Sequence, residues 1–264
     1  MGTNVQYAVR SGRAEITLDR PDVYNAFDAE MLVELNERLL DAHADDDVYV
    51  ILLTGNGKGF CSGADVSGMD GREDRKNAFT YGEHLWAVQH AIRLLRFGEK
   101  PTVAAVNGPA VGAGCGFALA CDLRVFAEGA FFRQGFIDVG LVPGEGSAWL
   151  LPRLIGESKA REIHLTGRDV DAETAVELGL AVEAVPASDV VTAARSLANE
   201  VRDKPAVAVR HTRALLGDDG SFAEHCHDAH DRQWECVTDE EHRTAAAAVA
   251  DGRSPDLDRP SDAG

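Results

Sequence analysis

Two short apolar segments constrain the fold of this chain more than any other feature. Residues 48–55 read VYVILLTG and residues 101–108 read PTVAAVNG, and each is an unbroken run of the kind found in strands buried on both faces. Segments 27–47 and 84–97 carry apolar residues at helical spacing, the first of them behind Asp28 as a helix N-cap. This alternation of strand and helix predicts parallel crossover units and an α/β fold.

The remaining segments indicate one main domain with a smaller appendage. Residues 14–21 and 122–134 read as extended structure, 66–82 as a polar, mobile loop, and the chain from Gly144 onward as mostly helical. We expect a core domain over residues 1–200, a C-terminal helical region over 201–252 and a disordered polar tail over 253–264.

Composition argues against several partners and locations. The 264 residues carry a formal net charge of −18, which opposes binding to nucleic acid or to an anionic membrane. No apolar run approaches the length of a membrane span, and the N-terminus lacks the hydrophobic region of a signal peptide. Five cysteines without a framework spacing predict free, mostly buried thiols and a cytoplasmic location. The spread of acidic residues suggests the solvated surface of a halophilic protein.

Each apolar segment is followed by a loop of small residues. Gly63-Ala64 follows the first strand, and Gly112-Ala113-Gly114 follows the second, within the bare stretch NGPAVGAGCGFALACD at 107–122. Ligands of open α/β sheets bind beyond the carboxyl ends of such strands. Two backbone N–H groups with little side-chain bulk in front of them could stabilise one developing oxyanion. The alternative is that these glycines serve tight turns and close helix packing.

Several ordered motifs identify a resemblance to a known family. KGFCSGADV at 58–66 and AAVNGPAVGAGCGFALACDLRV at 104–125 resemble the two signature segments of the enoyl-CoA hydratase/isomerase, or crotonase, superfamily. The likeness extends over about residues 5–215, through LDRPDVYNAF, VGLVPGEGSAWLLPRLIG and LTGRDVDAETAVELGLAVEAV. The resemblance implies a spiral of repeated ββα units with a C-terminal helical region that forms a homotrimer or a dimer of trimers.

The same resemblance implies an acyl-CoA substrate and a set of binding residues. The backbone N–H groups of Ala64 and Ala113 would form the oxyanion hole for the thioester. No separate cofactor and no metal are expected, because coenzyme A is part of the substrate. The coenzyme A moiety would be held around two segments, at Val23, Tyr24, Ala26, Ser62, Ala64, Asp65 and Val66.

The proton-transferring acids depart from the hydratase pattern. Hydratases of this family use two glutamates, and the corresponding positions here hold Gly116 and Phe136. The sequence is more similar to the isomerase branch exemplified by phenylacetate degradation, in which a single acid follows the GLVP turn. The usual position of that acid is Gly144, and Glu145 comes next. Glu145 is therefore the leading proton carrier, with stabilisation of a helix N-terminus as its alternative role.

Other titratable residues are weaker candidates. Asp138, two residues after Phe136, is a second catalytic candidate or else a hydrogen-bonding turn residue. His84 and His90 lie on a predicted helix without a visible partner. The cluster of His225, Cys226, His227, His230 and Cys236 has acceptable zinc ligands by type, but a helix would point them in different directions, so no metal site is expected.

We therefore expect an enoyl-CoA isomerase-like enzyme with a single acid/base. An enoyl-CoA hydratase, a catalytically inactive acyl-CoA-binding protein and a hydrolase on the same fold are the alternatives. The absence of a glutamate at both hydratase positions is the most direct evidence for a catalytically inactive acyl-CoA-binding protein.

Overall fold

A computed structural model describes residues 3–65, 76–217 and 220–260, with the backbone alone over 76–83. Its main sheet has the strand order β1-β2-β3-β4-β6-β9. β1 (Val5–Arg10) pairs antiparallel with β2 (Arg13–Leu18), and the other neighbours pair in parallel: β3 (Val50–Gly55), β4 (Thr102–Val106), β6 (Leu123–Ala127) and β9 (Glu183–Val185). A small second sheet contains β5 (Ala110–Val111), β7 (Phe131–Arg133) and β8 (Asp169–Asp171). The predicted α/β fold is confirmed.

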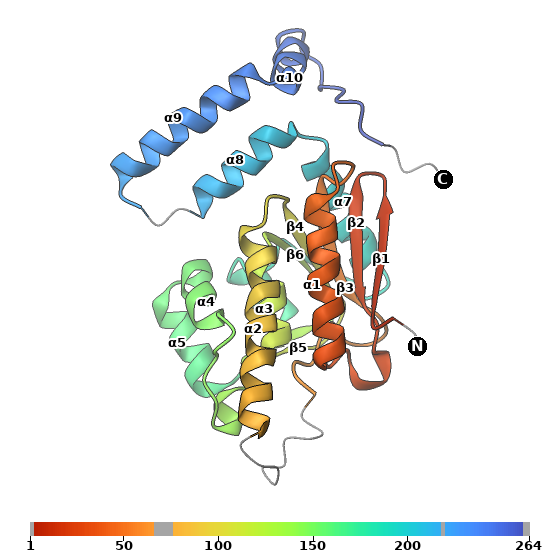
Figure 1. Ribbon diagram of the computed structural model, residues 1–264, viewed down its shortest axis with the longest axis vertical. Helices are drawn as coiled ribbons and strands as arrows, with labels where there is room; N and C mark the ends of the chain where they lie inside the picture. Colours follow the sequence, from red (N-terminus) through yellow and green to blue (C-terminus); the bar gives the residue numbers. More distant parts are fainter. Residues whose placement is uncertain (1–2, 66–75, 218–219, 261–264) are drawn as a thin grey trace.

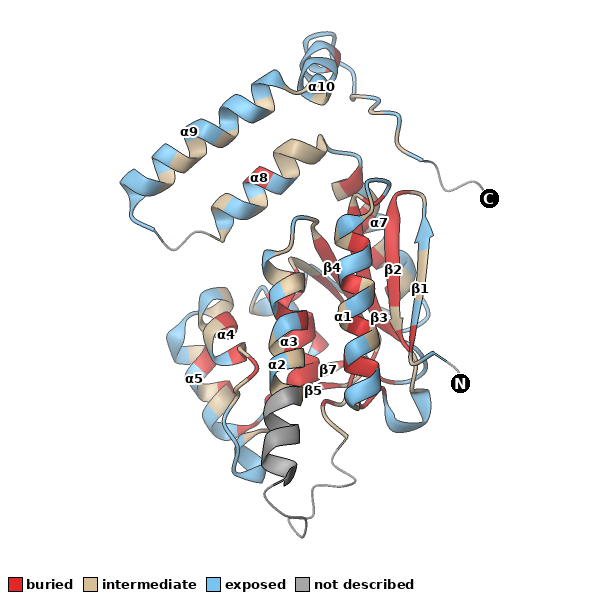
Figure 2. Cartoon of the chain, in the orientation of Figure 1, coloured by how far each residue is buried: buried red, intermediate tan, exposed pale blue. Residues whose placement is uncertain are grey.

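Helices cover both faces of the main sheet. α1 (Ala29–Ala44) and α2 (Lys76–Phe97) pack side by side in front of it, and α7 (Val190–Arg202) packs behind β3, β4 and β6 (Figure 1). Every residue of β3 and β4 is buried as a result, which confirms the reading of both apolar segments (Figure 2). The predicted N-cap is also confirmed, since the Asp28 carboxylate accepts a 2.9 Å hydrogen bond from the Met31 N–H.

The loops at the carboxyl ends of β3 and β4 lead to a compact group of shorter elements. α3 (Ala113–Ala120) is buried along its whole length, and it packs between α2 and α4 (Ser147–Ile155). α5 (Glu157–Thr166) and α6 (Ala172–Glu177) complete the core. A 3₁₀ turn, η1 (Pro21–Val23), follows β2, and a second, η2 (Ile137–Val139), follows β7.

Three C-terminal helices form a separate layer above the core, as Figure 1 shows. They are α8 (Ala206–Leu216), α9 (Phe222–Thr238) and α10 (Glu240–Ala250). Beyond α10 the chain has no helix or strand over residues 253–260, yet it is anchored at Arg259. This guanidinium stacks 4.0 Å from the centre of the Tyr49 ring and pairs with Glu241 at 2.7 Å. Of the tail that we expect over 253–264, this part is held by defined contacts, and residues 261–264 lie outside the described residues.

The prediction that the chain after Gly144 is mostly helical is confirmed by α4 to α10, but it misses the short strands β8 and β9. A three-residue strand at a sheet edge is too short to show a periodic pattern. α2 begins at Lys76, so residues 76–82 are helical and not part of a loop. The rest of the predicted loop, 66–75, lies outside the described residues.

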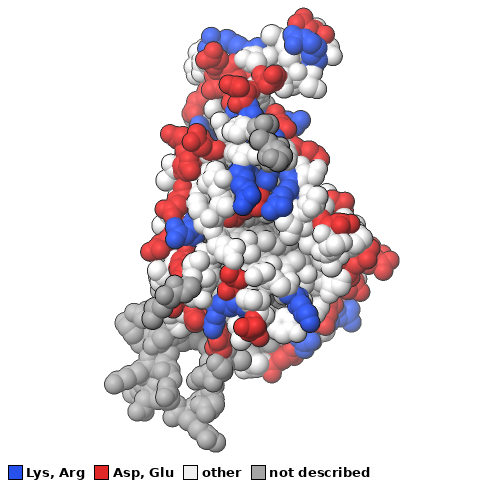
Figure 3. Space-filling view, turned by 90° about the vertical axis from the view of Figure 1, so that its right-hand side faces the viewer, with Lys and Arg blue, Asp and Glu red and all other residues white. Residues whose placement is uncertain are grey.

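Acidic side chains are spread over the face shown in Figure 3, whereas basic ones form small groups. All five cysteines are free, and Cys61, Cys115 and Cys121 are buried, whereas Cys226 is exposed and Cys236 is partly so. Within the described residues, no helix is both long enough and apolar enough to cross a membrane.

Candidate active site

The two glycine loops lie against each other at the carboxyl edge of the sheet. The Val111 N–H donates to the Cys61 carbonyl at 2.9 Å, and a Cβ added at Gly114 would lie 2.1 Å from that same oxygen. A Cβ added at Gly108 would lie 2.1 Å from the Lys58 carbonyl oxygen. Glycine is therefore required at positions 108 and 114 because the loops pack closely, which agrees with the alternative role given to these glycines in the sequence analysis.

The same contact brings Ala64 and Ala113 into one cavity of about 210 Å³. Phe27 pairs with the first loop through the Gly63 carbonyl and the Asp65 N–H, which leaves the Ala64 N–H unused. Ala113 is the first residue of α3, where an N–H has no acceptor inside the helix. No group in the described part of the chain accepts a hydrogen bond from either N–H. Both donors are thus available to a ligand.

Most of the cavity wall is apolar. Phe136, which the resemblance aligns with the second hydratase glutamate, lies over Gly112, whose added Cβ would be 3.5 Å from the ring. Of the described residues that line the cavity, only Ser62, His84 and Glu145 have polar side chains. The apolar side chains are Phe27, Leu85, Val88, Val111, Phe136, Val139 and Leu141. Such a wall suits a hydrocarbon group close to a small number of polar atoms.

Glu145 is the only carboxylic acid among these lining residues. Its side chain is 2% exposed, and neither carboxylate oxygen has a hydrogen-bond partner among the described residues. Burial raises the pKa of Glu145 to about 7, and nearby Ser147 and the backbone N–H groups oppose this rise only in part. A carboxyl that titrates near neutrality can both take up and release a proton.

Glu145 occupies the space that Gly116 leaves open. A Cβ added at Gly116 would lie 2.9 Å from Glu145 Cγ and 3.3 Å from its Oε1. The resemblance aligns Gly116 with the first hydratase glutamate, but the linear sequence does not show that an acid from the turn before α4 lies next to this glycine. The proximity of Glu145 to Gly116 depends on the folded structure and cannot be seen in the order of residues along the sequence.

The segments expected to hold coenzyme A are adjacent. The Ser62 N–H donates to the Tyr24 carbonyl at 3.0 Å, and Ser62 Oγ donates to the Val23 carbonyl at 3.1 Å. Val23 and Tyr24 are exposed, Ala26 is buried, and Asp65 pairs with Arg20 at 3.4 Å. Val66 lies outside the described residues.

Sequence reasoning missed the buried Asn25. It has a left-handed backbone, and its side chain donates to the Gly59 carbonyl at 2.8 Å. An asparagine tolerates this conformation, so NAF at 25–27 was a usable signal.

Asp138 does not share the cavity with Glu145. It lies in the 3₁₀ turn η2 and forms a 2.9 Å ion pair with Arg133 at the surface. Strand alternation would have placed it on the same side as Phe136, but the chain turns immediately after β7. His90 is likewise elsewhere, hydrogen-bonded to Asn36 at 2.9 Å. Of the two histidine candidates, only His84 lines the cavity.

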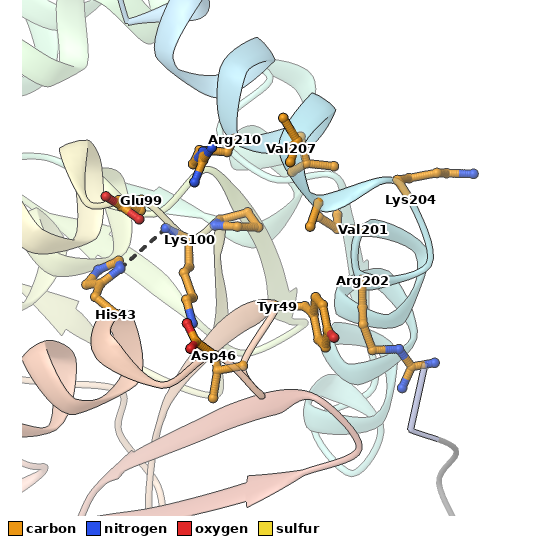
Figure 4. Close-up of a pocket in the computed structure, with 14 residues that line it drawn as sticks. His43, Asp46, Tyr49, Glu99, Lys100, Val201, Arg202, Lys204, Val207 and Arg210 are labelled. Atoms are coloured by element: carbon orange, nitrogen blue, oxygen red, sulfur yellow. Dashed lines mark hydrogen bonds between the residues drawn. The ribbon is translucent and has the colours of Figure 1, made fainter. Parts of the chain in front are cut away.

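A second cavity of about 180 Å³ lies at the opposite edge of the sheet, between the C-terminal end of α1 and α8 (Figure 4). Its groups are largely engaged: the His43 Nδ1 accepts from the Lys100 N–H at 3.3 Å, Lys100 Nζ donates to the Asp45 carbonyl, and Arg202 donates to the Ser11 carbonyl at 2.9 Å. Its described lining acids are Asp46 and Glu99, neither of them buried, so we assign the chemistry to the first cavity, where Glu145 is buried. The histidines and cysteines from His225 to Cys236 lie along α9, and no metal-binding cluster of three occurs within the described residues.

Comparison with known proteins identifies the family of this chain. Residues 9–241 match the model of a family described as enoyl-CoA hydratase/isomerase. A Mycobacterium bovis protein named "Probable enoyl-CoA hydratase echA12" is 42% identical over 189 residues, which cover 70% of this chain and 66% of that protein. A second M. bovis protein, "Probable enoyl-CoA hydratase echA8", is 36% identical over 76% of each chain.

Solved structures show the same architecture. The enoyl-CoA hydratase from Bacillus anthracis superposes with a TM-score of 0.89 at 26% identity, covering 96% of this chain and 98% of that one. The enoyl-CoA hydratase from Mycobacterium smegmatis gives a TM-score of 0.88 at 26% identity, with 97% and 99% covered. The crotonase-type fold expected from the motifs is confirmed.

Proposed function

Because the chain belongs to the enoyl-CoA hydratase/isomerase family, we propose that it is an enzyme that moves the double bond of an enoyl-CoA thioester. The backbone N–H groups of Ala64 and Ala113 bind the thioester oxygen and stabilise the enolate that forms when a neighbouring carbon loses a proton. Glu145 takes that proton and returns it to a different carbon. One acid is sufficient, because isomerisation consumes no water.

The observation that carries this proposal is the placement of Glu145. It is a buried carboxyl without a hydrogen-bond partner among the described residues, in the cavity that the Ala64 and Ala113 N–H groups line, and its pKa of about 7 suits a group that alternates between base and acid. The apolar Phe136 stands where a second acid would hold water. This arrangement also argues against an inactive binding protein, since an ionisable group buried without a partner costs stability.

Hydration of a 2-enoyl-CoA is the second candidate. It is favoured by the position of Glu145, which fills the space in front of Gly116 and could there direct one water molecule. The relatives described above also carry hydratase names. This mechanism would need a single carboxyl to serve both proton transfers.

The distinguishing experiment is mass spectrometry of the reaction in deuterated buffer. We expect the purified protein to interconvert a medium-chain 2-enoyl-CoA and its 3-enoyl isomer without the gain of one water, and Glu145→Gln to abolish the conversion. Glu128→Gln, a change at an exposed carboxylate away from the cavity, is the matched control. Gain of water would establish the hydratase, and release of free coenzyme A would indicate a hydrolase.

We further propose that α9 and α10 mediate assembly into a homotrimer or a dimer of trimers. Phe222 and Trp234 on α9 are 83% and 67% exposed in the single chain, and Val249 on α10 is 68% exposed. Apolar side chains that extend from one layer support an interface there. Light scattering of the purified protein tests this assembly.

A further inference from the structure

A buried hydrogen-bond chain connects the two helices that begin next to the cavity. Ser147 Oγ donates to Gln134 Oε1 at 3.0 Å, and Gln134 Nε2 donates to Cys115 Sγ at 3.2 Å. All three residues are at most 2% exposed. Cys115 lies two residues after Ala113 in α3, and Ser147 lies two residues after Glu145 at the start of α4. These hydrogen bonds therefore link the helix that carries the Ala113 N–H to the turn that carries Glu145.

The chemistry of the middle residue suits this connection. A glutamine amide donates from one end and accepts at the other, so Gln134 satisfies both of its neighbours at once. Burial, followed by the nearby Glu145 charge, raises the pKa of the Cys115 thiol well above its usual value, so the thiol stays neutral. These hydrogen bonds thus hold α3 and α4 together without placing a charge beside Glu145.

The turn that carries Glu145 needs such external support. The Glu145 side chain makes no hydrogen bond of its own within the described residues, and Gly146 has a positive φ of 122°. On one side, Gln89 Nε2 donates to the Gly144 carbonyl at 2.7 Å. On the other side, Ser147 is held through Gln134. The partly buried amide of Gln89 and the buried amide of Gln134 therefore hold the turn from opposite ends.

We propose that Gln134 is a positioning residue that sets the separation between the Ala113 N–H and the Glu145 carboxyl. The inference rests on the function proposed above. Proton transfer depends steeply on geometry, and a displacement of about 1 Å can cost about 100-fold in rate. Loss of the amide frees α4 from α3 and leaves the Ser147 hydroxyl buried without its acceptor.

The test is a steady-state comparison of wild type with Gln134→Leu, using a medium-chain 3-enoyl-CoA. We expect kcat to fall about 10- to 100-fold, with KM changed by less than about threefold. We also expect the pH midpoint of kcat to shift, because Glu145 moves into a different environment. A structural role alone would lower the unfolding temperature but leave the pH midpoint, and kcat per active site, unchanged.

A matched pair at the far end of the chain tests the hydrogen bond itself. Cys115→Ser keeps an acceptor for Gln134 Nε2, whereas Cys115→Ala removes it, so the alanine variant is expected to lose at least about fivefold more kcat. If Gln134→Leu does not fold, Ser147→Ala cuts the same chain with a smaller change in volume and carries the same expectation.

The outcomes separate the inference from the proposed function. Absence of turnover by wild type with either isomer would remove the proposed function. If wild type is active and Glu145→Gln is not, the function stands, and an unchanged kcat and pH midpoint in Gln134→Leu would overturn the role of Gln134 alone. Equal kcat in the two Cys115 variants would overturn it as well.

Discussion

At the scale of single residues, the protonation of Glu145 is coupled to folding. Its pKa is about 7 in the folded protein and near the ordinary 4.5 when the chain is unfolded. Between these values the folded state keeps a proton that the unfolded state has lost, so the free energy of unfolding falls as the pH rises through this window. A change from 4.5 to about 7 corresponds to about 3 kcal/mol.

Glu145→Gln removes this dependence and should stabilise the protein above pH 7. We expect the variant to exceed wild type by up to about 3 kcal/mol at pH 8 and to match it at pH 4.5. Urea unfolding of both proteins at the two pH values measures the difference. If the difference in unfolding free energy between the variant and wild type is the same at both pH values, the carboxyl is not desolvated in the folded state.

Gly116 is the second residue on which the site depends. In Gly116→Ala, the new Cβ would lie 2.9 Å from Glu145 Cγ and 3.0 Å from Ile92 Cδ1, so the carboxyl must move. We expect kcat to fall about tenfold or more. Stability should change by less than about 1 kcal/mol, because better helix propensity offsets the crowding. Steady-state kinetics and thermal unfolding check the two effects. An unchanged kcat in Gly116→Ala would contradict the placement of the Glu145 carboxyl in the space beside Gly116.

At the scale of elements, the sequence was most informative where a pattern is local. β3, β4 and the start of α1 follow from unbroken apolar runs and from Asp28, because burial and capping are encoded within a few residues. The three-residue strands β8 and β9 depend on distant partners and could not be predicted. The sequence leaves two possible roles for Asp138, and its place in the 3₁₀ turn after β7, paired with Arg133, agrees with the turn role rather than the catalytic one.

The contact between the two glycine loops makes an element-scale prediction. A side chain at position 114 meets the Cys61 carbonyl at 2.1 Å, and backbone on both sides of this contact is buried. We expect Gly114→Ala to destabilise the protein by about 2 kcal/mol or more. Gly129→Ala is the matched control, because nothing lies within 4 Å of its added Cβ, and it should stay within about 0.5 kcal/mol of wild type. Equal unfolding midpoints for the two variants would contradict the close packing.

At the scale of the whole molecule, the ionic contacts are distributed unevenly. Glu15 on β2 pairs with Arg13 and, across to α7, with Arg195, each at 2.7 Å, and Asp122 pairs with Arg213 of α8 at 2.6 Å. The pairs with Arg195 and Arg213 connect different elements, whereas Arg13 and Glu15 lie on the same strand, and all of them involve buried or half-buried side chains. The sequence has 44 acidic residues but only 26 lysines and arginines, so a large excess of negative charge remains. The sum is a net repulsion that favours expansion of the chain.

Salt should therefore stabilise this protein. The distance over which charges interact falls from about 10 Å at 0.1 M to about 3 Å at 1 M ionic strength, which removes most repulsion between surface carboxylates while affecting the buried pairs less. We expect a gain of about 1 kcal/mol between 0.1 and 1 M potassium chloride, equivalent to about 2–4 °C in the unfolding midpoint. Potassium sulfate at equal ionic strength separates the causes, because sulfate also acts by exclusion from the protein surface. A rise in sulfate without one in chloride would assign the effect to that exclusion and reject charge screening.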